Sequence, residues 1–191
     1  MHRWSWTVIE CCWGAWAITW ITLAFSAKRT VERPGGAWSW GAVVGAVAVY
    51  AAIRAATGRS WVHEQVVVVV VPRAVQVLAV ALVACGLGFC TWARVTIGRN
   101  WSGSVALKED HELIETGPYA LARHPIYTGM LAMVLGSAID YPAAVSYTGL
   151  GLVIVVFFFK SRREERLMDE HFPDQCPAYR ARVKAIIPFI V

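Results

Sequence analysis

Two apolar runs joined by a two-residue connection decide the fold: ALARHPIYTGMLAMVLGSAI (residues 120–139), then DY, then PAAVSYTGLGLVIVVFFF (residues 142–159). A helix needs about 20 mostly apolar residues to cross the hydrocarbon core of a bilayer. This connection, Asp140-Tyr141, followed directly by Pro142, is typical of a tight turn. The sequence therefore predicts a transmembrane helical hairpin.

The composition of the whole chain also indicates a membrane protein. Of 191 residues, 57% are apolar and 16% are charged, whereas soluble domains carry about 45–50% and about 25%. A single soluble core of this length cannot bury so much apolar surface, so most of it must face lipid. This excludes a disordered chain and an ordinary soluble enzyme.

Three further runs are long and apolar enough to span the membrane: residues 6–27, 37–57 and 66–92. The third starts with the β-branched stretch Val66–Val71, but a lone strand would leave its backbone unpaired in lipid, so we expect a helix. Pro72 is predicted to kink this helix or to mark where its embedded part begins. The fold class is thus an all-α membrane bundle of about five transmembrane helices.

Basic residues set the predicted orientation. With the amino terminus outside and the carboxyl terminus in the cytoplasm, most of the 18 Lys and Arg residues lie on the cytoplasmic side, as the positive-inside rule requires. Two polar segments, residues 93–119 and 160–191, then flank the hairpin at the inner membrane surface. We expect any active site there, in an integral, multi-pass protein.

Two charges lie inside predicted spans near the outer surface, Glu10 and Arg54. Charges in lipid are costly unless they are paired or reach water. They indicate a structural ion pair, side chains that snorkel to the surface, or a polar site in the outer leaflet, with Arg73 as a candidate third member.

The five cysteines are an odd number, which argues against a complete disulfide framework. No cysteine pair has zinc-site spacing with a nearby pair of histidines, so no metal is expected. Membrane lipids are expected partners, and nucleic acid is not.

The two cytoplasmic segments carry the residues suited to chemistry. Residues 108–119 read KEDHELIETGPY and lead to Arg123-His124-Pro125, where a helix amino terminus with free amides can hold an anionic group. The alternative is that Arg123 and His124 only anchor the span at lipid headgroups. In the tail, residues 160–166 read KSRREER. The spacing of Lys160 and Glu164 predicts an i,i+4 ion pair. This pair is expected either on a solvated face of the helix or over the mouth of the hairpin.

Several motifs follow one another in a fixed order over roughly residues 95–190: NWS (100–102), HELI (111–114), GPY (117–119), RHPIYTG (123–129), EE (164–165), Phe172, Tyr179 and Pro188. Together they resemble the isoprenylcysteine carboxyl methyltransferase family. The Arg-His-Pro-x-Tyr element alone also resembles phospholipid methyltransferases and membrane sterol reductases. Its combination with the upstream His-x-Leu-Ile and the downstream Glu-Glu favours the first family.

The resemblance implies S-adenosyl-L-methionine as methyl donor and a lipophilic carboxylate, such as a prenylated cysteine, as acceptor. The implied cofactor contacts, carried over by position, are His111, Glu112, Leu113, Ile114, Tyr119, His124, Pro125, Ile126, Tyr127 and Glu164. The family's basic substrate contact is an Arg where this chain has Lys160, and Lys offers a point charge instead of a planar fork. Arg163 is the alternative substrate contact. Lys160, Arg163 and Glu164 are the expected catalytic residues.

We expect two parts in the chain: residues 1–92, with three transmembrane helices facing lipid and acceptor, and residues 93–191, one continuous domain with the cofactor-binding loop, the transmembrane hairpin and the cytoplasmic tail. The tail departs from the family at Pro173 and Cys176, which puts its path in question. Two other activities stay open: a phospholipid N-methyltransferase and a membrane NADPH-dependent reductase. A membrane scaffold without enzymatic activity would leave the ordered motifs unexplained.

Overall fold

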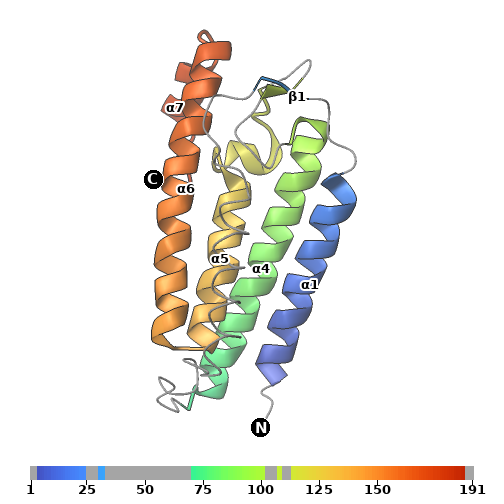
Figure 1. Ribbon diagram of the computed structural model, residues 1–191, viewed down its shortest axis with the longest axis vertical. Helices are drawn as coiled ribbons and strands as arrows, with labels where there is room; N and C mark the ends of the chain where they lie inside the picture. Colours follow the sequence, from blue (N-terminus) through green and yellow to red (C-terminus); the bar gives the residue numbers. More distant parts are fainter. Residues whose placement is uncertain (1–3, 25–29, 33–69, 102–106, 109–112, 188–191) are drawn as a thin grey trace, which may run out of the picture.

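The computed structural model describes residues 4–24, 30–32, 70–101, 107–108 and 113–187. Within them, long helices form a bundle (Figure 1): α1 (Trp4–Ala24), α4 (Arg73–Ile97), α5 (Pro125–Asp140) and α6 (Ala144–His171). By length and composition α1, α4 and α6 can cross a membrane, and α5 is a shorter apolar helix of 16 residues. The chain is an integral membrane protein. The span predicted at 37–57 lies outside the described residues.

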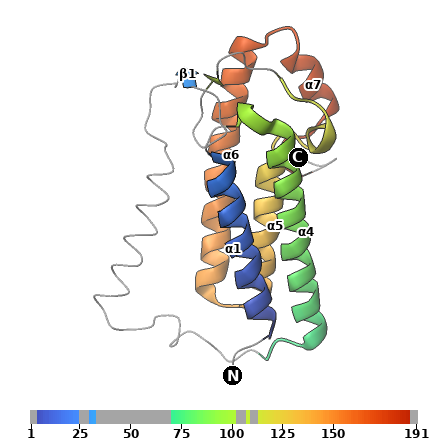
Figure 2. The ribbon, with the colours of Figure 1, turned by 90° about the vertical axis from the view of Figure 1, so that its right-hand side faces the viewer.

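The short elements gather at one end of the bundle. They are β1 (Thr30–Glu32) paired antiparallel with β2 (Leu107–Lys108), the 3₁₀ turns η1 (Gly98–Asn100) and η2 (Gly117–Ala120), and helix α7 (Cys176–Arg182). Figure 2 shows β1 and α7 at the same end, beyond the end of α1. This end, where α4 stops and α5 starts, carries the residues singled out for chemistry.

The predicted hairpin is confirmed, with one correction to where its first helix begins. The helices α5 and α6 are separated only by residues 141–143, and Ala143 N donates to Tyr141 O at 2.9 Å in the turn. The first helix begins at Pro125 and not at residue 120. The reason is that proline disfavours helical backbone in the residue before it, and His124 has φ −121° and ψ 60°.

Helix α4 begins directly after Pro72, so this proline marks the start of the helix and does not kink it. Gln76 N donates to Pro72 O at 3.0 Å in the first turn. The helix runs past the predicted end at residue 92 and stops at Gly98, whose φ of 53° ends helical geometry. Of the charges noted near the outer surface, Glu10 and Arg73 are exposed, and Arg54 lies outside the described residues.

Glycines bring the backbones of α4 and α5 into direct contact. A Cβ added to Gly129 would lie 2.6 Å from Gly86 O and 2.6 Å from Cys90 Sγ, and one added to Gly136 would lie 2.7 Å from Ala79 O. Small residues allow such close approach between apolar helices. In lipid, these helices are held together by van der Waals packing and not by the hydrophobic effect. The seam fixes α5, and with it the residues at its start.

Candidate active site

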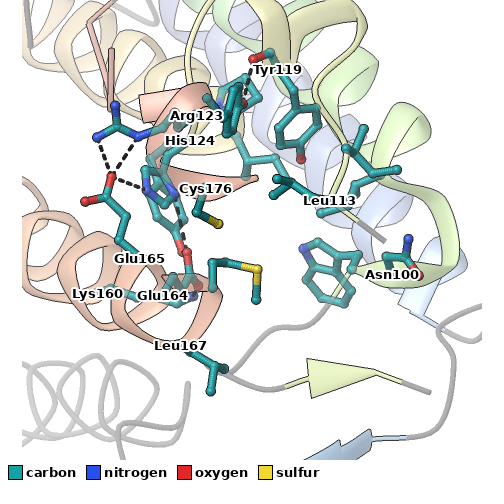
Figure 3. A pocket seen from close by; sticks show the side chains of 18 of the residues that line it. Asn100, Leu113, Tyr119, Arg123, His124, Lys160, Glu164, Glu165, Leu167 and Cys176 are labelled. Atoms are coloured by element: carbon teal, nitrogen blue, oxygen red, sulfur yellow. Dashed lines mark hydrogen bonds and ion pairs between the residues drawn. The ribbon is translucent and has the colours of Figure 1, made fainter. Parts of the chain in front are cut away.

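A cavity of about 180 Å³ lies where α5 begins, between the end of α4, the last turns of α6, and α7 (Figure 3). Its wall includes residues of both segments that flank the hairpin. Most residues predicted for the site line it: Leu113, Ile114, Tyr119, His124, Pro125, Ile126, Tyr127, Lys160 and Glu164. Two segments far apart in the chain thus meet at one cavity.

The remaining predicted site residues are placed differently. His111 and Glu112 lie outside the described residues. Arg163 is exposed on α6 and is not one of the residues that line the cavity, whereas Lys160 lines it with a side chain only 13% exposed.

Glu164 is the centre of the polar wall. Tyr127 Oη donates to it, 2.7 Å from Oε1 and 2.8 Å from Oε2. His124 Nδ1 lies 3.4 Å from Oε2, and Lys160 Nζ lies 4.0 Å from Oε1, which confirms the predicted i,i+4 pair. A carboxylate with these neighbours is held in one orientation at the edge of the cavity, as Figure 3 shows.

His124 stands between two carboxylates of α6. Its ring stacks on Tyr127 with centroids 5.3 Å apart, and its Nε2 lies 3.4 Å from Glu165 Oε1. Burial disfavours the charged imidazole, but Glu164 and Glu165 outweigh it, so the pKa of His124 lies above its usual value. The two carboxylates therefore stabilise the charged form of the imidazole.

Glu165 connects the start of α5 to the tail. Arg123 donates to its Oε1 from Nε at 2.9 Å and from a terminal nitrogen at 2.6 Å. Arg180 of α7 lies 3.6 Å from its Oε2 and also pairs with Asp169 at 2.5 Å. These ion pairs hold α7 over α6 beside the cavity.

The chain after α7 is bound to the start of α5 through its backbone. Arg123 N donates to Lys184 O at 2.8 Å, and His124 N donates to Ala185 O at 2.8 Å. Thr128 Oγ1 donates to Ile186 O. The tail therefore satisfies two backbone donors in the segment 123–124 directly before the helix, where the sequence suggested a site for an anion.

Residues 74–175 match a sequence model of the family described as "Phospholipid methyltransferase". The chain belongs to this family. Among curated relatives, protein-S-isoprenylcysteine O-methyltransferase of Saccharomyces cerevisiae is 34% identical over 122 residues, covering 60% of this chain and 49% of the relative. The Schizosaccharomyces pombe enzyme of that name is 33% identical over 118 residues, covering 60% and 50%. The chain spans about half the length of these relatives.

A solved structure described as the eukaryotic intramembrane Ras methyltransferase ICMT, an isoprenylcysteine carboxyl methyltransferase, is also similar to this member of the family. The TM-score is 0.52 at 25% identity, covering 61% of this chain and 45% of that one. The resemblance predicted from the motifs is confirmed.

Several cavity residues of this family member were not among the predicted contacts. They are Trp20, Ile97, Asn100, Trp101, Arg123, Met130, Glu165, Leu167, Met168, Asp169, Cys176, Tyr179 and Arg180. Of these, five belong to the quoted motifs, which was a usable signal: Asn100, Trp101, Arg123, Glu165 and Tyr179. Trp20 comes from α1 and has no local pattern that links it to a cavity formed by α4, α5 and α6.

Proposed function

We propose that the protein transfers a methyl group from S-adenosyl-L-methionine to the carboxylate of a lipophilic substrate such as a prenylated cysteine. The observation that carries this proposal is the cavity in which the Tyr127–Glu164–His124 cluster lies beside Lys160. The relatives of the chain named protein-S-isoprenylcysteine O-methyltransferase support the same activity.

The residues at the cavity fit this methyl donor. Its ammonium and sulfonium groups are cations, and the Glu164 side chain, which is 24% exposed, lines the cavity with a carboxylate. His124 lines the same cavity, with its Nε2 3.4 Å from Glu165 Oε1. We assign the donor's contacts to Glu164, His124 and Tyr127, together with the other contacts that the resemblance implies: His111, Glu112, Leu113, Ile114, Tyr119, Pro125 and Ile126. When bound, the donor supplies an electrophilic methyl group.

The acceptor needs no general base if it is a carboxylate. A carboxyl group with a pKa near 4 is already ionised at neutral pH, so the protein has to align the oxygen and exclude water. Alignment alone can contribute about 7–11 kcal/mol to lowering the barrier. We assign this role to Lys160 and not to Arg163, because Lys160 lines the cavity and lies next to Glu164.

The cavity also has an apolar wall that suits the lipid part of the acceptor. Trp20, Met130 and Trp101 line the same cavity from α1, α5 and the residue after η1. Trp20 stacks on Trp16 with ring centroids 4.9 Å apart. A lipid-linked carboxylate would place its charged end at Lys160 and its apolar end along these rings.

We also propose the cytoplasmic side for the cavity, with the amino terminus outside and about five spans. The exposed residues Arg162, Arg163 and Arg166 of α6 lie at the cavity end of the bundle. The positive-inside rule assigns this end to the cytoplasm. The division into residues 1–92 and 93–191 stays a prediction, although Trp20 shows that the first part also contributes to the cavity.

Lys160→Ala is expected to lower kcat about 100-fold, because a misplaced reacting oxygen can cost about that much in rate. Affinity for S-adenosylhomocysteine should stay within about threefold, and Lys160→Arg should recover most of the activity. Arg163→Ala, a change at an exposed position of the same helix, should behave like the parent. Titration calorimetry and turnover measure the two effects separately. Equal turnover of Lys160→Ala and the parent would remove Lys160 from this role.

A second candidate is phospholipid N-methylation, which the description of the matching family favours. An amine acceptor must lose a proton, so that reaction calls for a base with a kinetic pKa. The reductase alternative has no such support, because the matching family is described as methyltransferases.

A further inference from the structure

The turn Gly98–Asn100 and the following Trp101 form a rigid corner of the cavity. Arg94, only 1% exposed, donates to Gly98 O at 2.8 Å and to Leu23 O at 2.5 Å. Its guanidinium also lies 4.4 Å from the centre of the Trp101 ring. One buried side chain thus ties the end of α1, the turn and the indole together, so Asn100 is held in a fixed position.

Asn100 presents an unused hydrogen-bond acceptor at this corner. It lines the cavity and is 8% exposed. Its Oδ1 is buried and accepts no hydrogen bond from the part of the chain that the structure describes. A buried carbonyl without a donor is destabilising, so a native acceptor of this kind indicates a donor that arrives with a ligand.

The location of Asn100 indicates which part of a ligand it meets. Figure 3 shows Asn100 and Leu113 across the cavity from Lys160 and Glu164. A ligand that spans the cavity therefore meets charges at one end and a neutral amide with apolar neighbours at the other. S-adenosyl-L-methionine has this polarity, with a charged amino-acid end and a neutral, planar adenine.

We propose that Asn100 recognises the adenine ring of the methyl donor, an inference that rests on the proposed function. The exocyclic 6-amino group of adenine donates to Oδ1, and the Asn100 amide can donate in return to a ring nitrogen, the pairing by which Asn reads adenine in nucleic acids. Leu113 and Ile114 line the same cavity and offer apolar contact to the ring faces. Asn100, quoted in the first motif, thereby gains a role.

The test compares S-adenosylhomocysteine with its analogue in which unsubstituted purine replaces adenine, by calorimetry on the detergent-solubilised full chain. The parent should bind the analogue about tenfold more weakly, the size of one hydrogen bond. Asn100→Ala should weaken S-adenosylhomocysteine about tenfold and bind both ligands alike. The matched control is Gln175→Ala, which removes an exposed amide at the start of α7 and should keep the preference.

Each outcome has one meaning. Equal affinity of the parent for both ligands overturns the inference, and so does an Asn100→Ala variant that keeps the parent's preference. In both cases the methyl-donor site itself stands. The comparison within the parent needs no variant, so poor folding of Asn100→Ala does not prevent the test. If the parent binds neither ligand, the proposed function fails and the inference fails with it.

Discussion

Gly129→Ala is expected to destabilise the bundle by about 3 kcal/mol, at the upper end of what overpacking costs. The new Cβ would lie 2.6 Å from Gly86 O, 2.6 Å from Cys90 Sγ and 2.9 Å from Cys90 N. Two of these atoms belong to the backbone of α4 and cannot rotate away, so α5 must move as a unit. Thermal unfolding in detergent measures the effect.

The matched control is Gly151→Ala in α6, where an added Cβ meets nothing within 4 Å. There the change should be neutral or stabilising by up to about 1 kcal/mol, since Ala is the better helix former. Tyr127 precedes Gly129 by two residues, so the displaced helix should also bind S-adenosylhomocysteine more weakly. Equal unfolding temperatures for the two variants would show that α4 and α5 do not meet along this seam.

Glu164→Gln is expected to weaken S-adenosylhomocysteine binding about 100-fold, because removing one member of a buried, hydrogen-bonded charge pair costs about 2–5 kcal/mol. The amide keeps the shape of the side chain and an acceptor for Tyr127 Oη. The loss of affinity therefore measures the effect of removing the negative charge. His124 and Lys160 lose the carboxylate that lies 3.4 Å and 4.0 Å from them.

The control for this change is Glu170→Gln, at an exposed position of the same helix. It should bind S-adenosylhomocysteine like the parent. Parental affinity in Glu164→Gln would remove Glu164 from the cofactor contacts and leave the polar wall with a structural role.

The hairpin could be predicted because span length and turn residues are local properties of the sequence. The same locality explains the error at its start: the apolar run from residue 120 looks continuous, but Pro125 forces non-helical backbone on His124. The backbone bonds from Arg123 and His124 to the tail could not be predicted, since carbonyl partners leave no pattern in side chains.

For the site, too, residues related by local spacing could be predicted, whereas residues brought together by packing could not. Lys160 and Glu164 are one helical turn apart, so their pairing follows from spacing alone. The choice between Lys160 and Arg163 depends on which face of α6 packs against α5, and that needs the structure. Trp20 joins the site through packing, where Arg94 ties the end of α1 to the turn after α4.

The central claim is methyl transfer to a carboxylate, and the product tests it most directly. The full chain is supplied with methyl-labelled S-adenosyl-L-methionine and, in separate reactions, with S-prenylated cysteine analogues and ethanolamine lipids. We predict label on the cysteine analogues that mild base releases as methanol, as an ester requires. Base-stable label on the ethanolamine lipids, with none on the cysteine analogues, would contradict the claim.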